Sequence, residues 1–316
     1  MKTEVPTPKS SKARRSGKLR ARQPARRGLP AVGFIGAGRT GTALAWHCRR
    51  LGYPIAGVAD KRPRQAWVAY GLLKLPYERL RTTEVAARSR VLFLTTPDSA
   101  IAPEYAAVRR WLLPGALVVH CSGAHGIEAL GGHRDAGHEA LALHPVQSFA
   151  SHAQAIANLP GSTFAVEGTP AGLRFASVLV RRLRGSLVTI RGEDRPLYHA
   201  MCVFASNFLN VLGDAVEDLA GKVGLNKRDG VRTLAALPRA VLENIIESGS
   251  LASLTGPVQR GETQTVARHV AALRGRAPQL VPLYRSLSLH LTLMAARQGL
   301  PAARVRRLRA VLREAR

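Results

Sequence analysis

The chain has 316 residues, enough for two domains with a sizeable hydrophobic core, and its 47 Lys and Arg against 20 Asp and Glu give a formal net charge of +27. Three scattered cysteines, Cys48, Cys121 and Cys202, argue against a disulfide-rich secreted domain. No apolar run approaches the roughly 20 residues that cross a bilayer. We therefore expect a soluble, cytoplasmic protein that has no membrane partner.

Residues 1–30 hold ten of the basic residues and one acid, Glu4, without apolar periodicity. This composition predicts a disordered basic tail. Such a tail could touch nucleic acid or an anionic membrane, or direct the chain to an organelle. Because arginine excess recurs elsewhere, as in Arg181, Arg182 and Arg184, compositional bias is the favoured explanation and nucleic-acid contact is not favoured.

The segment after the tail predicts a dinucleotide-binding turn. An apolar run at 32–35 leads into Gly36-Ala37-Gly38-Arg39-Thr40-Gly41, then a helical pattern, then a second apolar run at 55–59. In such a βαβ unit Gly36 allows the tight turn, Gly38 lets the backbone approach a pyrophosphate, and Gly41 lets helix and strand pack closely. The phosphates would lie at the helix N-terminus. A glycine-rich turn that binds nothing is the alternative.

The choice between NAD and NADP stays open in the sequence. Asp60 stands where a carboxylate would accept hydrogen bonds from a ribose 2′-hydroxyl, which favours NAD. The cationic residues Lys61 and Arg62 follow at once and could attract a 2′-phosphate, which favours NADP. Solvated loop cations are the alternative for these two residues.

Further apolar runs predict the other strands of a doubly wound, Rossmann-type α/β sheet over residues 31–192. They lie at 91–95, 117–120, 140–143, 163–166 and 186–190. Ligands bind at the carboxyl ends of such strands, so Thr95, Thr96 and Pro97 are predicted to contact the cofactor.

From residue 193 the pattern predicts long helices, so an all-helical C-terminal domain over 193–316 follows the sheet. The predicted helices are 197–223, 227–247, 262–274, 279–298 and 302–314, and Pro238 should kink or split the second of them.

Two strand ends carry polar residues suited to catalysis. Ser122 and Gly123 follow the run at 117–120, and His144 and Gln147 end the next run. His144, whose unperturbed pKa is about 6.5, could exchange a proton with a carbonyl, imine or hydroxyl while a hydride moves to or from the cofactor. Ser122 could hydrogen-bond the same atom, with Gly123 and Gln147 beside the substrate. A strand-capping role for His144 is the alternative.

In the helical part, His199, Ser206 and Asn207 fall near one face of the helix predicted at 197–223. We expect them to face a substrate cleft, and hydrogen bonds between helices at a dimer seam are an equal alternative. Arg260, in a loop that begins a helix, could hold a substrate carboxylate or could pair with Glu262.

No metal site is predicted. His133 and His138 are five residues apart in a glycine-bounded loop and lack the spacing of helical metal ligands. We expect them to belong to a surface segment.

Taken together, these motifs resemble a family of Rossmann-like proteins with a C-terminal domain of unknown function. The motifs are GAGRTG at 36–41, TTPD at 95–98, HCSGAHG at 120–126, LHPVQSF at 143–149, YHAMCVFASNF at 198–208 and LTGPVQRGE at 254–262. The C-terminal domain of that family is similar to the helical domains of 6-phosphogluconate dehydrogenase and pyrroline-5-carboxylate reductase. The resemblance covers residues 31–316 and implies an NAD(P)-dependent oxidoreductase that forms a homodimer through the helical, substrate-binding domain.

Neighbouring families refine the residue roles that the resemblance implies. Prephenate dehydrogenases place a serine after one strand and a His-Pro pair after the next, which Ser122 and His144 match, although Gln147 departs from the small residues usual there. In β-hydroxyacid dehydrogenases and ketopantoate reductases a lysine begins a comparable helix, and His199 takes that position here. A lysine mechanism is therefore not expected, while Asn207 could orient a substrate.

We accordingly predict hydride transfer between NAD or NADP and a small-molecule substrate that carries a carbonyl, hydroxyl or imine group. The alternative function is a non-catalytic dinucleotide-binding sensor or scaffold.

Overall fold

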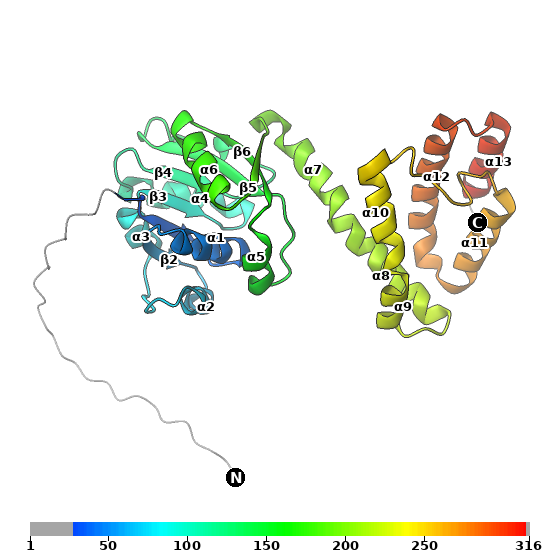
Figure 1. Cartoon of the computed structure of the whole chain (residues 1–316), viewed down its shortest axis with the longest axis horizontal. Coiled ribbons are helices and arrows are strands. Elements are labelled where there is room, and N and C mark those ends of the chain that lie inside the picture. The colour runs from blue at the N-terminus through cyan, green and yellow to red at the C-terminus, as the bar shows by residue number, and fades with distance from the viewer. Residues whose placement is uncertain (1–27, 314–316) are drawn as a thin grey trace, which may run out of the picture. The chain divides into compact units, whose positions relative to one another are not determined.

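The computed structural model describes residues 28–313, so almost all of the predicted basic tail lies outside the described residues. The chain divides into two compact units between Arg195 and Pro196, and each is described by itself. Figure 1 shows the first unit as a sheet flanked by helices and the second as helices only.

Seven strands form the sheet of the first unit, in the order β2-β1-β3-β4-β5-β6-β7. Their bounds are β1 Val32–Ile35, β2 Ile55–Ala59, β3 Val91–Leu94, β4 Leu117–His120, β5 Glu139–Pro145, β6 Thr163–Gly168 and β7 Ser186–Thr189. The predicted doubly wound, Rossmann-type fold is confirmed, and β1 to β5 pair in parallel. Strand β6 pairs antiparallel with β5 and parallel with β7, so the sheet is mixed.

The sheet topology creates a crevice beside β1. The chain passes from β1 to β2 on one side and then to β3 on the other side of β1. Ligands of open α/β sheets bind outside the carboxyl ends of the strands at such a switch point. The glycine turn after β1 and the Thr95 to Pro97 segment after β3 therefore lie at the expected ligand edge.

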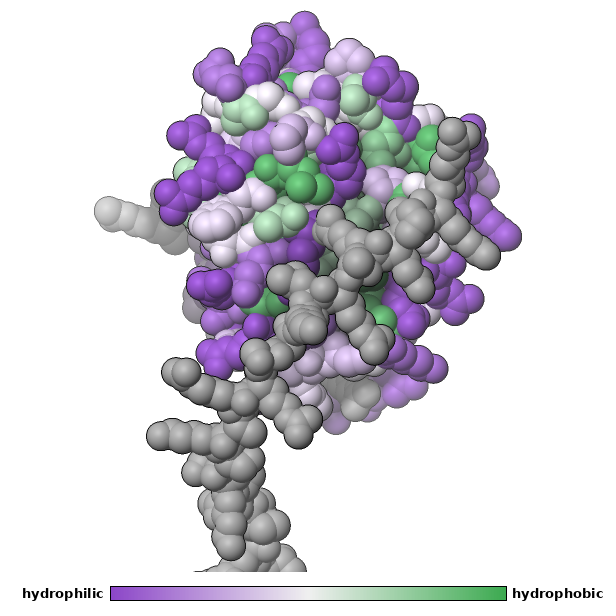
Figure 2. All heavy atoms as spheres, turned by 90° about the vertical axis from the view of Figure 1, so that its left-hand side faces the viewer, coloured by the Kyte–Doolittle hydropathy of each residue, from purple (hydrophilic) through white to green (hydrophobic). Residues whose placement is uncertain are grey.

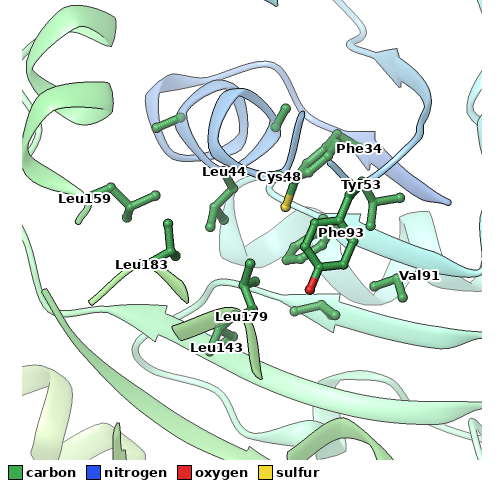
Figure 3. Packing of buried hydrophobic residues seen from close by; sticks show 14 of the residues in the cluster. Phe34, Leu44, Cys48, Tyr53, Val91, Phe93, Leu143, Leu159, Leu179 and Leu183 are labelled. Atoms are coloured by element: carbon green, nitrogen blue, oxygen red, sulfur yellow. The ribbon is translucent and has the colours of Figure 1, made fainter. Parts of the chain in front are cut away.

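Helices cover both faces of this sheet, which explains why its central strands are apolar throughout. The bounds are α1 Arg39–Arg50, α2 Pro63–Leu73, α3 Thr82–Arg88, α4 Asp98–Val108, α5 His152–Asn158 and α6 Pro170–Arg182. Side chains from α1, α2, α5 and α6 pack on one face, and those of α3 and α4 pack on the other. Figure 3 shows Leu44 and Cys48 of α1 in the first cluster with Phe34 and Phe93, whose rings stack with centroids 4.8 Å apart.

The second unit contains helices and no strand among its described residues. The bounds are α7 Arg195–Ala205, which begins in the first unit, α8 Asn207–Lys222, α9 Lys227–Leu234, α10 Ala236–Ser248, α11 Thr263–Arg276, α12 Val281–Arg297 and α13 Ala302–Arg313. Its buried cluster is small and comes from α11, α13 and the loop before α11: Val258, Val266, Val270, Leu308 and Leu312. Large apolar side chains of α7, α8 and α10 remain exposed.

Two of the predicted helices are broken. The helix predicted at 197–223 ends at Ala205 and restarts at Asn207, so that prediction is wrong at Ser206. There the Ser206 hydroxyl donates to the Cys202 carbonyl at 2.7 Å, a local bond that competes with helix geometry. The second helix is split as predicted, but at Ala235, and Pro238 lies in the first turn of α10, where proline is tolerated.

The loop that holds His133 and His138 lies at the surface as expected, but the two histidine side chains do not. Both are buried, at 8% and 7% exposure. The His138 Nδ1 lies 3.0 Å from the Tyr105 hydroxyl, and the His133 Nδ1 lies 2.9 Å from the Leu130 carbonyl oxygen, so local hydrogen bonds satisfy these nitrogens. Within residues 28–313 no group of three His, Cys, Asp or Glu is placed to hold a metal ion.

Within the same residues no helix is long and apolar enough to span a membrane. Figure 2 shows hydrophilic residues interspersed with small apolar patches over the visible face of the first unit.

Candidate functional site

The turn between β1 and α1 is shaped by three glycines with different surroundings. Gly36 has φ +102°, and a Cβ there would lie 2.5 Å from the Thr95 carbonyl oxygen. A Cβ on Gly41 would overlap the Thr95 hydroxyl and the Gly36 carbonyl. A Cβ on Gly38 would meet nothing within 4 Å. The turn is thus closed against β3 at its two ends and open at Gly38, the N-cap of α1, where no side chain caps the helix.

Two threonines after β3 complete this edge. The Thr95 hydroxyl donates to the Gly36 carbonyl at 2.6 Å and so ties the end of β3 to the glycine turn. The neighbouring Thr96 Oγ1 is buried and has no hydrogen-bond partner among the described residues. Pro97 is exposed at the N-cap of α4. A buried hydroxyl without a partner is uncommon in proteins, and an absent ligand is one explanation for it.

Asp60 braces the glycine turn. One of its oxygens accepts the Ala37 N–H and the other accepts the Arg62 N–H, both at 2.8 Å, and its side chain is only 7% exposed. The Arg62 guanidinium Nε lies 3.6 Å from the same carboxylate. Asp60, Lys61 and Arg79 also line a hollow of about 140 Å³ beside the end of β2. The carboxylate thus faces the protein backbone, while Lys61 and Arg79 contribute positive charge to the hollow and Glu78 contributes negative charge.

Arg39 and Thr40 occupy the first two positions of α1. The exposed Arg39 donates from Nη1 to the Phe149 carbonyl at 2.5 Å, so its side chain is directed to the loop after β5. Thr40 is half-buried.

The loop after β4 is folded around a buried histidine that the sequence interpretation missed. His120 ends β4 with no exposed surface. Its Nε2 donates to the Gly126 carbonyl at 2.8 Å, because a carbonyl can only accept, and its Nδ1 therefore accepts the Ser122 N–H at 3.3 Å. Burial lowers the pKa of His120 to about 4, against a weaker opposing effect of the Gly126 hydrogen bond. The imidazole is thus neutral and serves as a template for the loop.

The predicted catalytic serine takes part in this loop. Ser122 is 5% exposed, and its Oγ accepts the Ala124 and His125 N–H groups at 3.1 and 3.2 Å. Its carbonyl accepts Nη1 of Arg195 at 3.2 Å. Gly123 beside it is buried.

Arg195 and Glu167, also missed in the sequence, hold the other side of the loop. The Arg195 side chain has no exposed surface, and its Nε lies 3.6 Å from Glu167 Oε2. That oxygen also accepts the Ile127 N–H at 3.2 Å, while Oε1 accepts the Gly192 N–H at 3.1 Å. The one available signal was an acid in an otherwise apolar strand, β6, because such a carboxylate needs a cation nearby.

His144 lies near the end of β5, beyond the last residue that pairs with β4. It is half-buried and pairs in register with Ala165 of β6. Strand alternation puts it on the same sheet face as His120, since His120 lies opposite Ala142. Gln147 is exposed, and its Oε1 accepts the Ser148 N–H at 3.0 Å.

The other predicted site residues belong to the second unit. His199 is half-buried in α7, and Asn207 is exposed as the first residue of α8. Because Ser206 interrupts the helix, His199 and Asn207 do not share one continuous helical face. Arg260 forms the alternative ion pair, with Nε 2.6 Å from Glu262 Oε1.

Family comparisons match both parts of the chain. A Rossmann-like domain matches residues 15–145, and a domain of unknown function, DUF2520, matches residues 162–291. The resemblance predicted from the motifs is confirmed in both parts. No curated protein matches the chain.

Solved structures share the fold at low identity. A candidate NADP oxidoreductase from Bacteroides fragilis superposes with a TM-score of 0.71 at 22% identity, over 82% of this chain and 96% of that one. A reductive aminase from Aspergillus terreus in complex with NADPH and ethyl levulinate gives 0.58 at 15%, over 86% and 95%. Pyrroline carboxylate reductase from Plasmodium falciparum with NADP bound gives 0.53 at 13%, over 90% and 99%.

Proposed function

The chain joins a Rossmann-like domain to the DUF2520 domain, and from this premise we propose that it is an oxidoreductase that transfers a hydride between NADP and a small carbonyl, hydroxyl or imine compound. The observation that carries the proposal is the glycine turn at the sheet switch point, closed at Gly36 and Gly41 but open at Gly38. The three solved structures named above have an NADP oxidoreductase name or a bound NADP or NADPH, which supports the choice of cofactor class.

The residues present fit a dinucleotide. The space at Gly38 would let a pyrophosphate reach the free N–H groups and the positive end of the dipole of α1. The orphan Thr96 Oγ1 would gain a partner at the neighbouring strand end. When bound, the nicotinamide supplies or accepts the hydride. Ala37, Arg39, Thr40 and Pro97 complete the proposed cofactor-binding set.

The geometry at Asp60 favours NADP over NAD. Both carboxylate oxygens already accept backbone N–H groups and the side chain is only 7% exposed, so little of the carboxylate is open to a ribose 2′-hydroxyl. Lys61 and Arg79 line the hollow together with Glu78, and Arg62 lies beside Asp60. These three cations would attract a 2′-phosphate instead. We therefore propose that this loop selects the phosphorylated cofactor.

For the proton that accompanies the hydride we propose His144. In the reductive direction its imidazolium would give a proton to the substrate oxygen or nitrogen as a hydride reaches the adjoining carbon, and the reverse reaction would return both. Ser122 and Gly123 would hold the same atom, with Gln147 nearby. From the second unit, His199, Ser206, Asn207 and Arg260 stay predictions as substrate contacts.

We also propose that a second copy of the chain covers the apolar helices of the second unit. Leu197, Met201 and Phe204 in α7 are 77%, 60% and 70% exposed, and Ile246 in α10 is 76% exposed. Exposed apolar surface on this scale marks an interface. A second copy would bring an identical apolar face, which suits a symmetric dimer.

The first test is a titration of the purified chain with NADPH and NADH, followed by nicotinamide fluorescence. We expect saturable binding with NADPH at least tenfold tighter, and a Lys61→Ala/Arg62→Ala double variant that loses this preference. An Arg134→Ala variant, which removes an exposed cation from the loop before β5, is the matched control. Absence of binding by either nucleotide would defeat the oxidoreductase proposal.

The second test is NADPH oxidation with a panel of keto acids, ketones and cyclic imines. We expect turnover of at least one class and loss of most of it in His144→Ala. Tight binding without turnover on any compound would instead favour the dinucleotide-binding sensor.

A further inference from the structure

The loop from residue 122 to 127 leaves one backbone donor unused. The Ser122 N–H donates to His120 Nδ1, and the N–H groups of Ala124 and His125 both donate to Ser122 Oγ. The Gly126 N–H donates to the Glu128 carboxylate, and the Ile127 N–H donates to the Glu167 carboxylate. Gly123 is buried, and its N–H has no acceptor among the described residues. A buried donor without an acceptor costs free energy, so such a group calls for a ligand or another explanation.

The other end of the same peptide unit is held by a buried cation. Gly123 N–H and Ser122 C=O belong to one peptide, which is trans because the described residues contain no cis peptide bond. Arg195 Nη1 donates to that carbonyl at 3.2 Å. In a trans peptide the N–H and C=O point in opposite directions, so a contact that fixes the carbonyl also fixes the direction of the N–H.

Arg195 is itself fixed. Its side chain has no exposed surface, and Glu167 lies 3.6 Å from Nε. Glu167 is held in turn by the N–H groups of Ile127 and Gly192. The carboxylates of Glu128 and Glu167 lie against Gly126, where a Cβ would overlap both of them. The guanidinium is thus enclosed beside the loop, and its charge polarises the peptide that it contacts.

We propose that Arg195 is a positioning residue that orients and polarises the Ser122–Gly123 peptide, so that the Gly123 N–H donates to an electron-rich oxygen of the substrate. The inference rests on the proposed function and assigns this donor to a carbonyl or carboxylate oxygen. A planar guanidinium suits the task because its fork reaches the carbonyl and the carboxylate together, which a lysine cannot do with the same geometry.

The test compares Arg195→Met and Arg195→Lys with the wild-type chain. Arg191→Met is the matched control, since Arg191 is 72% exposed and its partners are the surface residues Glu193 and Asp194. Readouts are amide hydrogen exchange of the peptide that spans residues 121–127, the NADPH dissociation constant, and kcat and KM for the panel compound that the wild-type chain reduces best.

We expect Arg195→Met to speed exchange in this loop and to lower kcat/KM roughly tenfold to a hundredfold, the usual effect of losing a buried charged hydrogen bond. NADPH affinity should change less than twofold, because the glycine turn is untouched. Arg195→Lys should recover part of kcat/KM, and Arg191→Met should match the wild type in every readout. If Arg195→Met does not fold, Glu167→Gln and Arg195→Lys make the same comparison.

Unchanged loop exchange in Arg195→Met would overturn the proposal while leaving the oxidoreductase function intact. Faster exchange with unchanged kcat/KM would also overturn it, since Arg195 would then only stabilise the loop. A wild-type chain that oxidises NADPH with no panel compound would defeat the proposed function and, with it, the substrate role of Gly123. The exchange data would still decide whether Arg195 orders the loop.

Discussion

The two units of the chain differ in how far their own residues cover apolar side chains and pair buried polar groups. In the first unit, helices cover both faces of the sheet, and even the buried polar residues His120 and Arg195 have partners within the unit. In the second unit the buried cluster is small, and α7, α8 and α10 expose leucine, isoleucine, methionine and phenylalanine side chains. The contrast teaches that the nucleotide-binding half leaves only a few polar groups, such as Thr96 Oγ1, for a small ligand, whereas the helical half calls for a partner surface.

The largest expected effect comes from a charged substitution on the exposed apolar face of the second unit, which tests whether this face binds a second copy. Phe204 is 70% exposed, and its ring lies 4.8 Å from that of Phe208. We expect Phe204→Glu to halve the molar mass measured by light scattering, because a carboxylate cannot be buried unpaired in a dimer interface. Trp67→Glu is the control, since Trp67 is 62% exposed on α2 of the first unit. A wild-type chain that is already monomeric would contradict the dimer.

The pH dependence of the free energy of unfolding tests how the first unit holds the buried His120. The pKa of His120 is about 4 in the folded chain, below its ordinary value of 6.5, because burial disfavours the charged form. A lowered histidine pKa means that the unfolded chain binds the proton first. The free energy of unfolding should therefore fall by about 3 kcal/mol from this residue as pH drops from 6.5 to 4.

The measurement is chemical denaturation at several pH values in the wild type and in His120→Gln. The variant should be less stable at neutral pH but show a shallower loss below pH 6.5. Equal slopes in the two chains would show that His120 is not the group that titrates.

Substitutions at two glycines of the turn distinguish an effect on stability from an effect on NADPH binding. Gly41→Ala should lower the free energy of unfolding by about 1–3 kcal/mol, because the new methyl overlaps Thr95 and the Gly36 carbonyl. Gly38→Ala should leave the melting temperature almost unchanged and weaken NADPH binding, because its methyl enters open space where a phosphate would approach. Calorimetry and the fluorescence titration measure the two effects. Unchanged NADPH affinity in Gly38→Ala would contradict this phosphate position.

The smallest expected effect is at the C-cap of α2. Lys74 adopts φ 51°, a left-handed conformation that glycine adopts without a Cβ penalty. Lys74→Gly should raise the free energy of unfolding by less than about 1 kcal/mol. Thermal denaturation checks the sign, and a loss of stability would mean that the lysine side chain contributes contacts that outweigh its backbone strain.

The sequence was most informative where one physical demand dominates. Strands of this sheet read as apolar runs, so all seven were found, with ends shifted by no more than two residues, although β7 is exposed along its length. An apolar run carries no direction, and the antiparallel pairing of β6 was therefore not predictable from it. The break at Ser206 depends on one hydroxyl that bonds to the preceding turn, which helical periodicity does not reveal.

The candidate site was harder to predict for a different reason. Ser122 and His144 could be singled out because both follow strands, but their supporting residues are distant in sequence. Arg195 is 73 positions from Ser122, and only the folded chain brings its guanidinium to that carbonyl. His120 was read as the end of an apolar strand, although its two ring nitrogens organise the loop that follows.

The brace formed by Asp60 has a consequence for engineering. Replacing the acid at the end of β2 is an obvious way to change the cofactor preference. Here that substitution would leave the Ala37 and Arg62 amides without their acceptor and would loosen the turn that must hold either nucleotide. Redesign should therefore keep the carboxylate and work on the cations around it, Lys61 and Arg62 first.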